Sequence, residues 1–544
     1  MRRLLSCVWL MAGLVNAAPP YVLSSAHTAA AGRTRRIVVQ LDAADHRRLQ
    51  LPPEEWLRYI FTFPDQPGSQ IDSILLDIGL DTDSAVYPSN VLPPTPDRVI
   101  REWNAHGFEW VGALVRECRK RNLEVFWNHR FSEVDLNAEG KLEMETLHPM
   151  KAAHPDWLIR SWWWQGLWNV AVPEVRQMKV RLLRELVENY ALDGIQIDFA
   201  RHVPALPPGR QWENREGATE FLRMLRSMLM GVEKAQGRAI LLGVKVPHNV
   251  AGAHADGFDV ETWGKEHLVD RLTLGSRSMD VDVEGYRRAT AGSGIQLMPC
   301  FDDHHATDGY RFGSIEFLRG VFSSWWQQGA DGVTTFNWGV APPEIAAKVG
   351  DAVVSPSHSA GYQEIGSALT LRGKDKLFAV ERRGGYPWAE GVFNRNDTAA
   401  LPHLLPNDER ISNFMIRIAD NPGDLATAET NLHLVLFRAG AGDQLEVKFN
   451  DVRLSESQAE AEWKDPQIFS PDPQPASGGS GVYKINPKQK LLRLSYRLDP
   501  RWLRQGANDV QVRVKRRTSY PPATNIQLEK LEVSVAYSRH SGKH

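Results

Sequence analysis

Short apolar runs alternate with amphipathic segments from residue 36 to residue 340. Several runs are apolar at nearly every position, which is typical of parallel strands buried on both faces. Eight strand and helix alternations in series predict an α/β fold, a (β/α)8 TIM barrel, over residues 18–355. The eight runs are Ile37–Leu41, Ser73–Ile78, Leu123–Trp127, Gly194–Asp198, Ile240–Val246, Arg271–Leu274, Ile295–Cys300 and Gly332–Asn337.

The segments between these runs carry helical periodicity. Apolar residues recur at helical spacing in residues 173–190, behind a proline, and similar patterns cover residues 96–120 and 259–269. A doubly wound open sheet is the structural alternative. No G-x-G-x-x-G or P-loop sequence follows the first run, which removes the usual nucleotide-binding interpretation.

The pattern changes near residue 360 to short runs of alternating polarity separated by turn residues. This pattern predicts a C-terminal β-sandwich domain over residues 360–540. Residues 466–481 are rich in Pro, Gly and Ser and predict a loop within it. The runs are Leu377–Glu381, Met415–Ile418, Leu432–Phe437, Gln444–Phe449, Lys490–Tyr496, Asp509–Arg516 and Leu528–Tyr537.

The N-terminus predicts a secretory signal peptide over residues 1–17. Arg2 and Arg3 precede an apolar stretch from Leu4 to Val15, and small residues follow it. The alternative is a membrane anchor, but the stretch is shorter than the roughly 20 residues that span a bilayer. We therefore expect a secreted or periplasmic protein.

Composition and charge exclude further classes of protein and of site. The 544 residues carry a formal charge of −2, which is not the basic footprint of a nucleic-acid-binding protein. Three cysteines, one of them in the leader, make neither a disulfide framework nor a zinc site, so Cys118 and Cys300 are expected to be buried free thiols. Eighteen tryptophans suit both sugar stacking and a large core.

Polar residues gather at or just after the ends of seven of the eight predicted strands. In a barrel, the carboxyl ends of the strands meet at one rim, where catalytic groups lie. The residues are Asp77; Asn128, His129 and Arg130; Asp198, Arg201 and His202; Lys245, His248 and Asn249; Arg277 and Asp280; Asp302, Asp303, His304 and His305; and Asn337 and Trp338.

Asp198 is the sharpest of these candidates. It closes the fourth strand in the run Leu-Asp-Gly-Ile-Gln-Ile-Asp-Phe-Ala-Arg-His, so its carboxylate would emerge at the barrel mouth. A carboxylate there can act as a nucleophile or stabilise an oxocarbenium ion. The alternative is a structural aspartate held by loop amides. Asp193, at the start of the same strand, is expected to be structural.

The sequence around Asp198 resembles a known family. His-Pro-Asp-Trp-Leu at 154–158, Pro-Glu-Val-Arg at 173–176 and Asp-Gly-Ile-Gln-Ile-Asp at 193–198 resemble the pattern of glycosyl-hydrolase-like family 10. That family comprises secreted bacterial barrel proteins to which glycosidase activity is ascribed. The layout is similar over residues 36–340, and the motifs are specific over residues 150–200.

A more distant similarity to the α-amylase clan implies roles for several residues. It implies that Asp198 is the nucleophile, that Arg201 and His202 line a subsite, and that Asn128 and His129 form a substrate-binding pair. Two departures stand against a simple transfer of that mechanism. Gln196 stands where the clan has arginine, and the fifth strand reads Leu-Gly-Val-Lys-Val-Pro, without the clan's general-acid glutamate.

The second carboxylate must therefore come from elsewhere, because a glycosidase needs one protonated and one ionised carboxyl group. Asp302 and Asp303, which directly follow the seventh strand, are the first choice for the acid. Asp77 and Glu133 are further candidates for the acid. Asp77 could equally bind a sugar hydroxyl or a neighbouring loop, and Glu133 lies in the loop after the third strand. Glu261 is expected to be structural, in the first turn of a helix.

The remaining candidates concern substrate binding. Lys245 can hold an acidic sugar, pair with Asp198, or form a salt bridge inside the barrel. Asn337 and Trp338 close the eighth strand, and Trp338 is a candidate stacking platform. Adjacent histidines rarely reach one ion, so no metal or other cofactor is expected at His304 and His305.

Together these patterns predict a secreted glycoside hydrolase that acts on an oligo- or polysaccharide at the barrel mouth. Asp198, Asp302 and Asp303 are the expected catalytic residues, and Asp77, Arg201 and Lys245 are among the expected substrate-binding residues. Three alternatives stay open: a non-catalytic carbohydrate-binding protein on a degenerate barrel, a metal-dependent hydrolase, and a structural surface protein that assembles through its sandwich.

Overall fold

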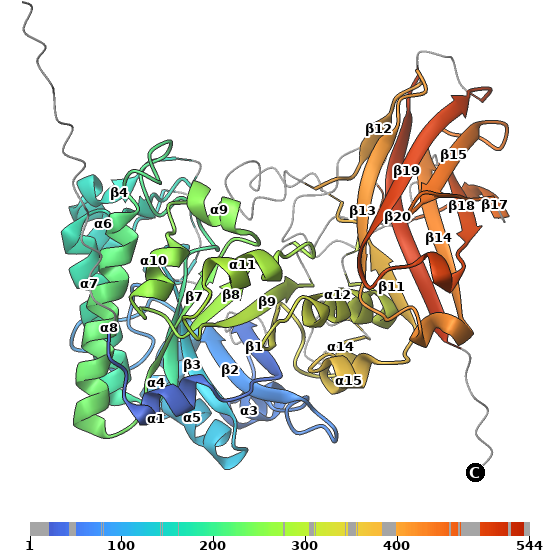
Figure 1. Ribbon diagram of the computed structural model, residues 1–544. Coiled ribbons are helices and arrows are strands. Elements are labelled where there is room, and N and C mark those ends of the chain that lie inside the picture. The colour runs from blue at the N-terminus through green and yellow to red at the C-terminus, as the bar shows by residue number, and fades with distance from the viewer. Residues whose placement is uncertain are drawn as a thin grey trace, which may run out of the picture.

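The computed structural model places a closed barrel beside two antiparallel sheets (Figure 1). The described residues are 21–42, 50–77, 79, 81–141, 143, 145–161, 163–275, 278–303, 309–310, 312–342, 344–345, 355, 357–382, 399–455, 458–465, 468, 490–519 and 524–537. The predicted signal peptide, residues 1–17, lies outside them, as does most of the predicted loop at 466–481.

Eight parallel strands close the barrel, in the order β1-β10-β9-β8-β7-β6-β3-β2. All eight predicted runs are confirmed as strands, because continuous apolar character marks strands covered on both faces. They are β1 (Ile37–Asp42), β2 (Ile71–Asp77), β3 (Glu124–Arg130), β6 (Gly194–Asp198), β7 (Leu241–Val246), β8 (Arg271–Leu274), β9 (Gln296–Asp302) and β10 (Val333–Phe336).

Helices surround the barrel and bury their apolar faces in one large core. They are α3 (Pro53–Ile60), α4 (Arg98–Ala105), α5 (Trp110–Lys120), α6 (Pro149–Ala153), α7 (Pro173–Asn189), α8 (Glu216–Gln236), α9 (Val250–Ala255), α10 (Val260–Lys265), α11 (Val283–Ala289) and α12 (Ile315–Gln327). The predicted helix at 96–120 is two helices, α4 and α5. Gly107 lies between them at φ +77°, a left-handed conformation that ends a helix.

The amino ends of the strands are closed by the short helix α1 (Ser25–Ala31). An inner apolar layer of Val38, Leu75, Phe126, Leu241 and Met298 lies beneath it, with Ala30 and Ala31 packed against that layer. This end of the barrel is therefore sealed, and polar side chains at the opposite end are free to form a site.

Between β3 and β6 the chain forms a small excursion on the mouth side. A short hairpin of β4 (Leu158–Ile159) and β5 (Leu167–Trp168) is preceded by a 3-10 turn at Pro155–Trp157. Its apolar residues form a cluster of their own: Val134, Leu136, Ile159, Trp163 and Leu167.

The C-terminal region is a β-sandwich, as predicted. One sheet has the order β11-β20-β14-β18-β17, with β12 paired to β20, and the other has the order β13-β19-β15-β16. A shared apolar core lies between them. The strands are β11 (Lys376–Ala379), β12 (His403–Leu405), β13 (Ser412–Ile418), β14 (Ala428–Phe437), β15 (Gln444–Phe449), β16 (Val452–Arg453), β17 (Gln458–Trp463), β18 (Leu491–Arg497), β19 (Gly506–Arg516) and β20 (Ile526–Tyr537).

Three of these strands, β12, β16 and β17, were not predicted. β12 and β16 have three and two residues, and none of the six residues of β17 is buried, so none of the three shows the burial alternation of a half-buried strand.

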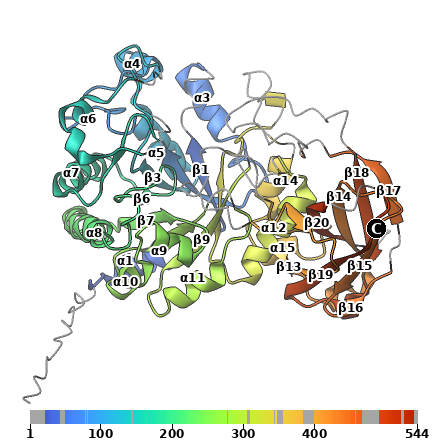
Figure 2. The same ribbon diagram turned by 90° about the horizontal axis from the view of Figure 1, so that it is seen from above.

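Helices α12, α14 (Ser357–Glu364) and α15 (Ala368–Leu371) lie between the barrel and the sandwich (Figure 2). Strand β11 packs directly on α12. The approach is close enough that a Cβ at Gly320 of α12 would lie 2.1 Å from the carbonyl oxygen of Leu377.

Cys118 and Cys300 are free and buried, as expected. Within the described part of the chain, no helix is long and apolar enough to cross a membrane.

Candidate active site

The strand pleat decides which candidates face the barrel interior. Successive side chains on a strand point to opposite faces. On β3, Asn128 and Arg130 point inward and bond Asp77, whereas His129 points outward. The predicted Asn-His pair is therefore split between two faces of the barrel wall.

His129 is buried on the outer face, near Lys179 and Asp83. Neither ring nitrogen has a hydrogen-bond partner among the described residues. Burial, reinforced by the charge of Lys179, lowers the pKa of His129 to about 3, so its ring is neutral. This environment does not suit a residue that binds substrate at the mouth.

Asp77 is the centre of a buried hydrogen-bond network inside the barrel. Its Oδ2 accepts from Gln40 Nε2 at 2.6 Å, Asn128 Nδ2 at 3.0 Å and Arg130 Nε at 3.0 Å. Its Oδ1 accepts from the Gly79 amide at 2.9 Å. With four hydrogen bonds to its two oxygens, Asp77 fixes the positions of the polar side chains around it.

The network continues around the barrel in both directions from Asp77. Asn128 Oδ1 accepts from Gln196 Nε2 at 2.8 Å, and Gln196 Oε1 accepts from Thr273 Oγ1 at 2.7 Å. On the other side, Gln40 Oε1 accepts from Lys245 Nζ at 3.0 Å. Six strands are thus linked beneath the mouth by polar side chains.

Asp198 stands at the end of β6 with its two oxygens in different environments. Oδ1 accepts from the amides of Ala200 and Arg201, both at 3.0 Å. Oδ2 has no hydrogen-bond partner among the described residues and lies 3.7 Å from Lys245 Nζ. The loop amides fix the carboxylate while one oxygen keeps its lone pairs available.

Asp302 and Asp303 separate in the same way as Asn128 and His129. Met298 of β9 belongs to the inner apolar layer, so Cys300 and Asp302, two and four residues later, also face inward. Asp302 Oδ1 accepts from Asn337 Nδ2 at 2.9 Å.

Asp303 instead faces helix α14, where its Oδ2 lies 2.7 Å from His358 Nε2. The other ring nitrogen, Nδ1, accepts from the Gly339 amide at 3.1 Å. The proton of His358 is therefore on Nε2 and is donated to Asp303.

The thiol of Cys300 shows that the inward groups are close together. Burial raises its pKa to about 12, the charge of Lys245 opposes that shift, and the charges of Asp302 and Asp198 add to it. Two carboxylates and one ammonium group therefore surround the same point at the mouth.

Residues 66–213 match the model of the glycosyl hydrolase-like 10 family. The stretch contains β2, β3 and β6, and so includes Asp77, Asn128 and Asp198. This confirms the resemblance that the sequence motifs predicted. A curated relative, glycosyl hydrolase YngK of Bacillus subtilis, is 25% identical over 146 residues. The match covers 27% of this chain and 28% of that relative.

Two of the solved structures to which the chain shows a weak likeness are titled as a fucosidase and a chitinase. An α-L-fucosidase isoenzyme 2 from Paenibacillus thiaminolyticus has a TM-score of 0.36 at 13% identity, over 61% of this chain and 48% of the other. A cell-surface chitinase from Paenibacillus sp. has a TM-score of 0.36 at 10% identity, over 92% of this chain and 56% of the other. Likenesses this low carry no argument about chemistry.

Within the family-matched stretch, other acids are already engaged. Glu133 bonds Arg130 Nη1 at 2.5 Å and the Val134 amide at 2.9 Å. His202 is buried with Nδ1 2.9 Å from the Ser132 carbonyl. Burial and the charge of Arg201 hold the pKa of His202 well below its usual value.

Outside that stretch, Glu261 pairs with His254 at 2.9 Å. Trp338 is 5% exposed and stacks on His358 with ring centroids 4.6 Å apart, so it does not present a face to a sugar at the mouth. His304, His305 and Arg277 lie outside the described residues. Among those described, no three His, Cys, Asp or Glu side chains are grouped to hold a metal ion.

Sequence reasoning missed the groups that connect the site. Gln40 and Thr273 are network members that lie within their strands, away from the strand ends where candidates were sought. It also missed Asp81, four residues beyond Asp77, which is 3% exposed at φ +52°. Burial raises the pKa of Asp81 to about 7, and the nearby charges of Asp83 and Asp135 add to the shift.

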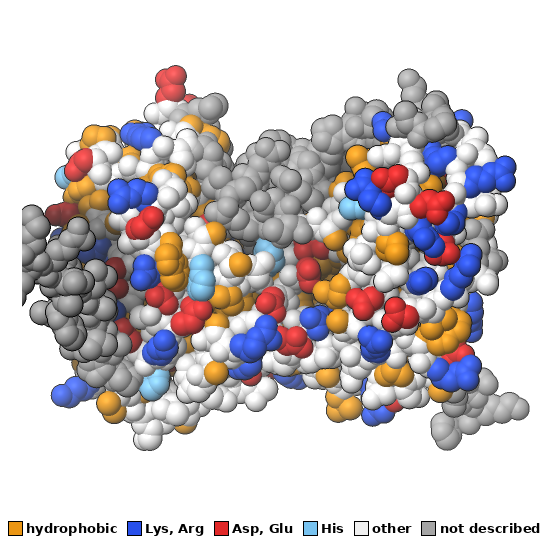
Figure 3. Space-filling model, turned by 45° about the horizontal axis from the view of Figure 1, so that its top comes forward, with side chains coloured by type: hydrophobic (Ala, Val, Ile, Leu, Met, Phe, Trp, Pro, Cys, Tyr) orange, Lys and Arg blue, Asp and Glu red, His pale blue; other side chains and the backbone are white. Residues whose placement is uncertain are grey.

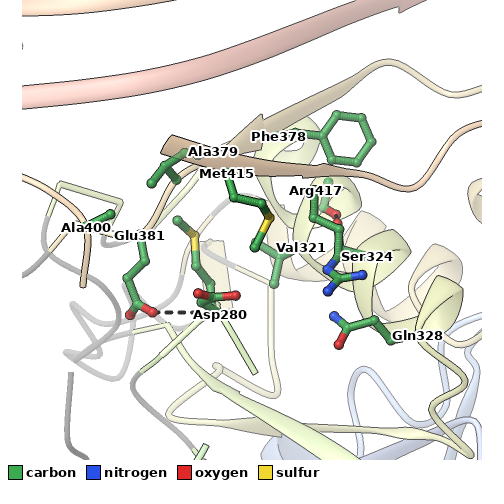
Figure 4. A pocket seen from close by; sticks show the side chains of 13 residues that line it. Asp280, Val321, Ser324, Gln328, Phe378, Ala379, Glu381, Ala400, Met415 and Arg417 are labelled. Atoms are coloured by element: carbon green, nitrogen blue, oxygen red, sulfur yellow. Dashed lines mark hydrogen bonds between the residues drawn. The ribbon is translucent and has the colours of Figure 1, made fainter. Parts of the chain in front are cut away.

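A pocket lies between the barrel and the sandwich (Figure 4). Asp280 of the β8–α11 loop, Arg417 of β13 and Glu381 line it together with Met415. Glu381 accepts from Ser278 Oγ at 2.5 Å and from the Asp280 amide at 3.3 Å. The sandwich therefore holds a loop that follows a barrel strand. Charged side chains of both signs are mixed over the face of the molecule that Figure 3 shows.

Proposed function

We propose that this protein is a glycoside hydrolase whose reaction takes place at the carboxyl ends of the barrel strands. The observation that carries the proposal is the setting of Asp198. Two amides fix its Oδ1, and its Oδ2 lies 3.7 Å from Lys245 Nζ without a hydrogen-bond partner in the described part of the chain. A glycosidase needs such an oriented carboxylate to meet the positive charge that develops at the anomeric carbon.

Asp302 is the proposed acid. Like Asp77 it is an inward carboxyl group, and Asn337 holds its Oδ1. The glycosidic C–O bond breaks as the proton of Asp302 moves to the leaving oxygen. Asp198 Oδ2 meets the positive charge at the anomeric carbon. A water molecule then adds its hydroxyl to that carbon and gives its remaining proton to Asp302, which restores the acid. Asp303 is not part of this pair, because it is bonded to His358 on the outer face.

The remaining mouth residues position the substrate in this proposal. Lys245, with Nζ 3.7 Å from Asp198 Oδ2, pairs with that carboxylate or binds an acidic substituent of the glycan. Arg201 and Asn337 are proposed to bind sugar hydroxyls, and the substrate is an oligo- or polysaccharide. The leader-like residues 1–17 support a secreted or periplasmic site of action.

The test is reducing-sugar release from a broad polysaccharide panel that includes sulfated and uronic glycans. Asp198→Asn should lower kcat by about 10³-fold or more on the glycan that the native protein cleaves, because the neutral amide cannot meet the cationic transition state. Asp193→Asn is a matched control at the other end of β6, where the carboxylate bonds Arg119 and the Val125 amide.

Equal turnover by Asp198→Asn and the native protein would overturn the site assignment. Glycan binding without turnover by both proteins would favour the second candidate, a non-catalytic carbohydrate-binding protein. That candidate rests on β7, which carries Lys245 and no acid near its carboxyl end.

A further inference from the structure

Arg271 is a buried cation at the sealed end of the barrel. It is the first residue of β8, its side chain points inward, and it is 4% exposed. The guanidinium carbon lies 4.4 Å from the ring centroid of Phe126, a member of the inner apolar layer. This position is at the opposite end of the barrel from Asp198.

The guanidinium of Arg271 lacks acceptors. None of its three nitrogens has a hydrogen-bond partner among the described residues. Its neighbour Arg35 is fully bonded, with Nε to Glu124 at 2.6 Å, Nη1 to Gln296 at 2.9 Å and Nη2 to Glu124 at 2.9 Å. Arg35 thus takes the acceptors that Arg271 would need.

The ion pairs at this end of the barrel leave Arg271 out. Arg35 pairs with Glu124 and Arg226 pairs with Asp270, whereas Arg271 forms no ion pair with a carboxylate in the described part of the chain. Burial and the charge of Arg35 lower the pKa of Arg271 to about 9, so it is still charged at neutral pH. A buried charge without a counter-charge or hydrogen bonds is strongly unfavourable.

The structure leaves room for a guest beside this cation. A cavity of about 10 Å³ is lined by Arg271, Arg35, Gln296 and the helix residue Ala31, enough for one water-sized guest. Gly243 forms one wall, and a Cβ there would lie 3.4 Å from Arg271 Nη2, so a larger residue would crowd the guanidinium.

We propose that this cavity is a binding site for one small monovalent anion, of the size of chloride, held by Arg271 and Arg35 beneath helix α1. A water molecule can accept hydrogen bonds there but cannot supply the missing negative charge. Phosphate and carboxylate ligands are larger than the cavity. The anion would stabilise the folded barrel from the end opposite the catalytic mouth, by binding only the native state.

The first test measures the thermal unfolding midpoint while sodium chloride replaces sodium gluconate at constant ionic strength. The midpoint of the native protein should rise with chloride concentration and then level off. Arg271→Met removes the unpaired cation, so its midpoint should not depend on chloride. Arg501→Met, at an arginine whose side chain is 85% exposed, should keep the native response. The same chloride response in Arg271→Met and the native protein would overturn the proposal.

A second test does not depend on the variant folding. A crystal of the native protein soaked in sodium bromide should show an anomalous scattering peak between Arg271 and Arg35. Anomalous signal absent there, together with a midpoint insensitive to chloride, would mean that water alone fills the cavity and that the proposal is wrong. Neither test uses a glycan, so the outcome is independent of the glycosidase proposal.

Discussion

At the scale of single residues, the site depends on which face of a strand each side chain takes. The pleat places neighbouring candidates on opposite faces of their strand. Asn128 and His129 are one such pair, and Asp302 and Asp303 are the other. One member of each pair faces the barrel interior, and the other is buried against the surrounding helices. Sequence proximity alone could not choose between the members, because both lie at the same strand end.

This division predicts different effects for the two neighbouring aspartates. Asp302→Asn should abolish glycan turnover with little change in stability, since an amide still accepts from Asn337. Asp303→Asn should keep turnover in the surviving folded protein but lower the free energy of unfolding by about 1–3 kcal/mol, because the bond from His358 weakens. Activity assays and denaturant titrations on both variants measure the contrast. Loss of turnover in Asp303→Asn alone would reverse the assignment of the acid.

At the scale of elements, helix α1 is locked onto the closed end of the barrel by a buried histidine. His27 Nε2 lies 2.9 Å from Asp270 Oδ1, and Nδ1 lies 2.8 Å from Glu233 of α8. Arg226 of α8 also pairs with Asp270. The lock joins α1 to α8 and to the turn before β8 through side chains more than 200 residues apart in sequence.

The lock should make stability depend on pH. Burial lowers the pKa of His27 and Arg226 acts in the same direction, but the bonds and charges of Asp270 and Glu233 outweigh both and raise it above the usual 6.5. A raised folded-state pKa gives stabilisation that is complete below pH 6.5 and is lost as pH rises through the folded-state value.

The measurement is the free energy of unfolding by urea between pH 6 and 9 for the native protein and His27→Gln. The free energy of unfolding of the native protein should exceed that of the variant at pH 6, and this difference should become smaller as the pH rises. An advantage that stays constant with pH would show that His27 does not titrate in the folded protein.

At the scale of the whole molecule, the barrel and the sandwich are joined by the contact of α12 with β11. Apolar residues of β11 face both cores, since Phe378 belongs to the sandwich core and Leu377 packs on the barrel core. Glu381, just after β11, bonds the β8–α11 loop near the mouth. The sandwich is therefore tied to the face of the barrel at which the carboxyl ends of the strands lie.

Gly320→Ala should weaken this contact. The new Cβ would meet backbone at Leu377, which cannot move without shifting β11, so we expect a loss of about 1–3 kcal/mol and faster proteolysis between the two parts. Gly231→Ala is the matched control, because no atom lies within 4 Å of a Cβ in that helix position. It should be neutral or slightly stabilising. Equal midpoints for the two variants in calorimetry would contradict the prediction.

The sequence by itself determined the barrel and the sandwich, and it singled out Asp198 as the first candidate for the site. Apolar runs, helical spacing and turn residues are local properties of the sequence. A strand that ends in an acid after buried isoleucines can likewise be recognised from its own residues, without knowledge of the strands beside it. The boundary at Gly107 and the short strands β12, β16 and β17 were missed because they rest on backbone geometry or on pairing with distant strands.

Only the tertiary structure decided what each polar group does. Asp77 became a saturated hub because Gln40, Asn128 and Arg130 converge on it from two other strands. Arg271 became an unpaired cation because Arg35, distant in sequence, takes the nearby acceptors. Hydrogen bonds and charges act over a few ångströms in space, and strand register around a closed barrel, which no local pattern encodes, sets those distances.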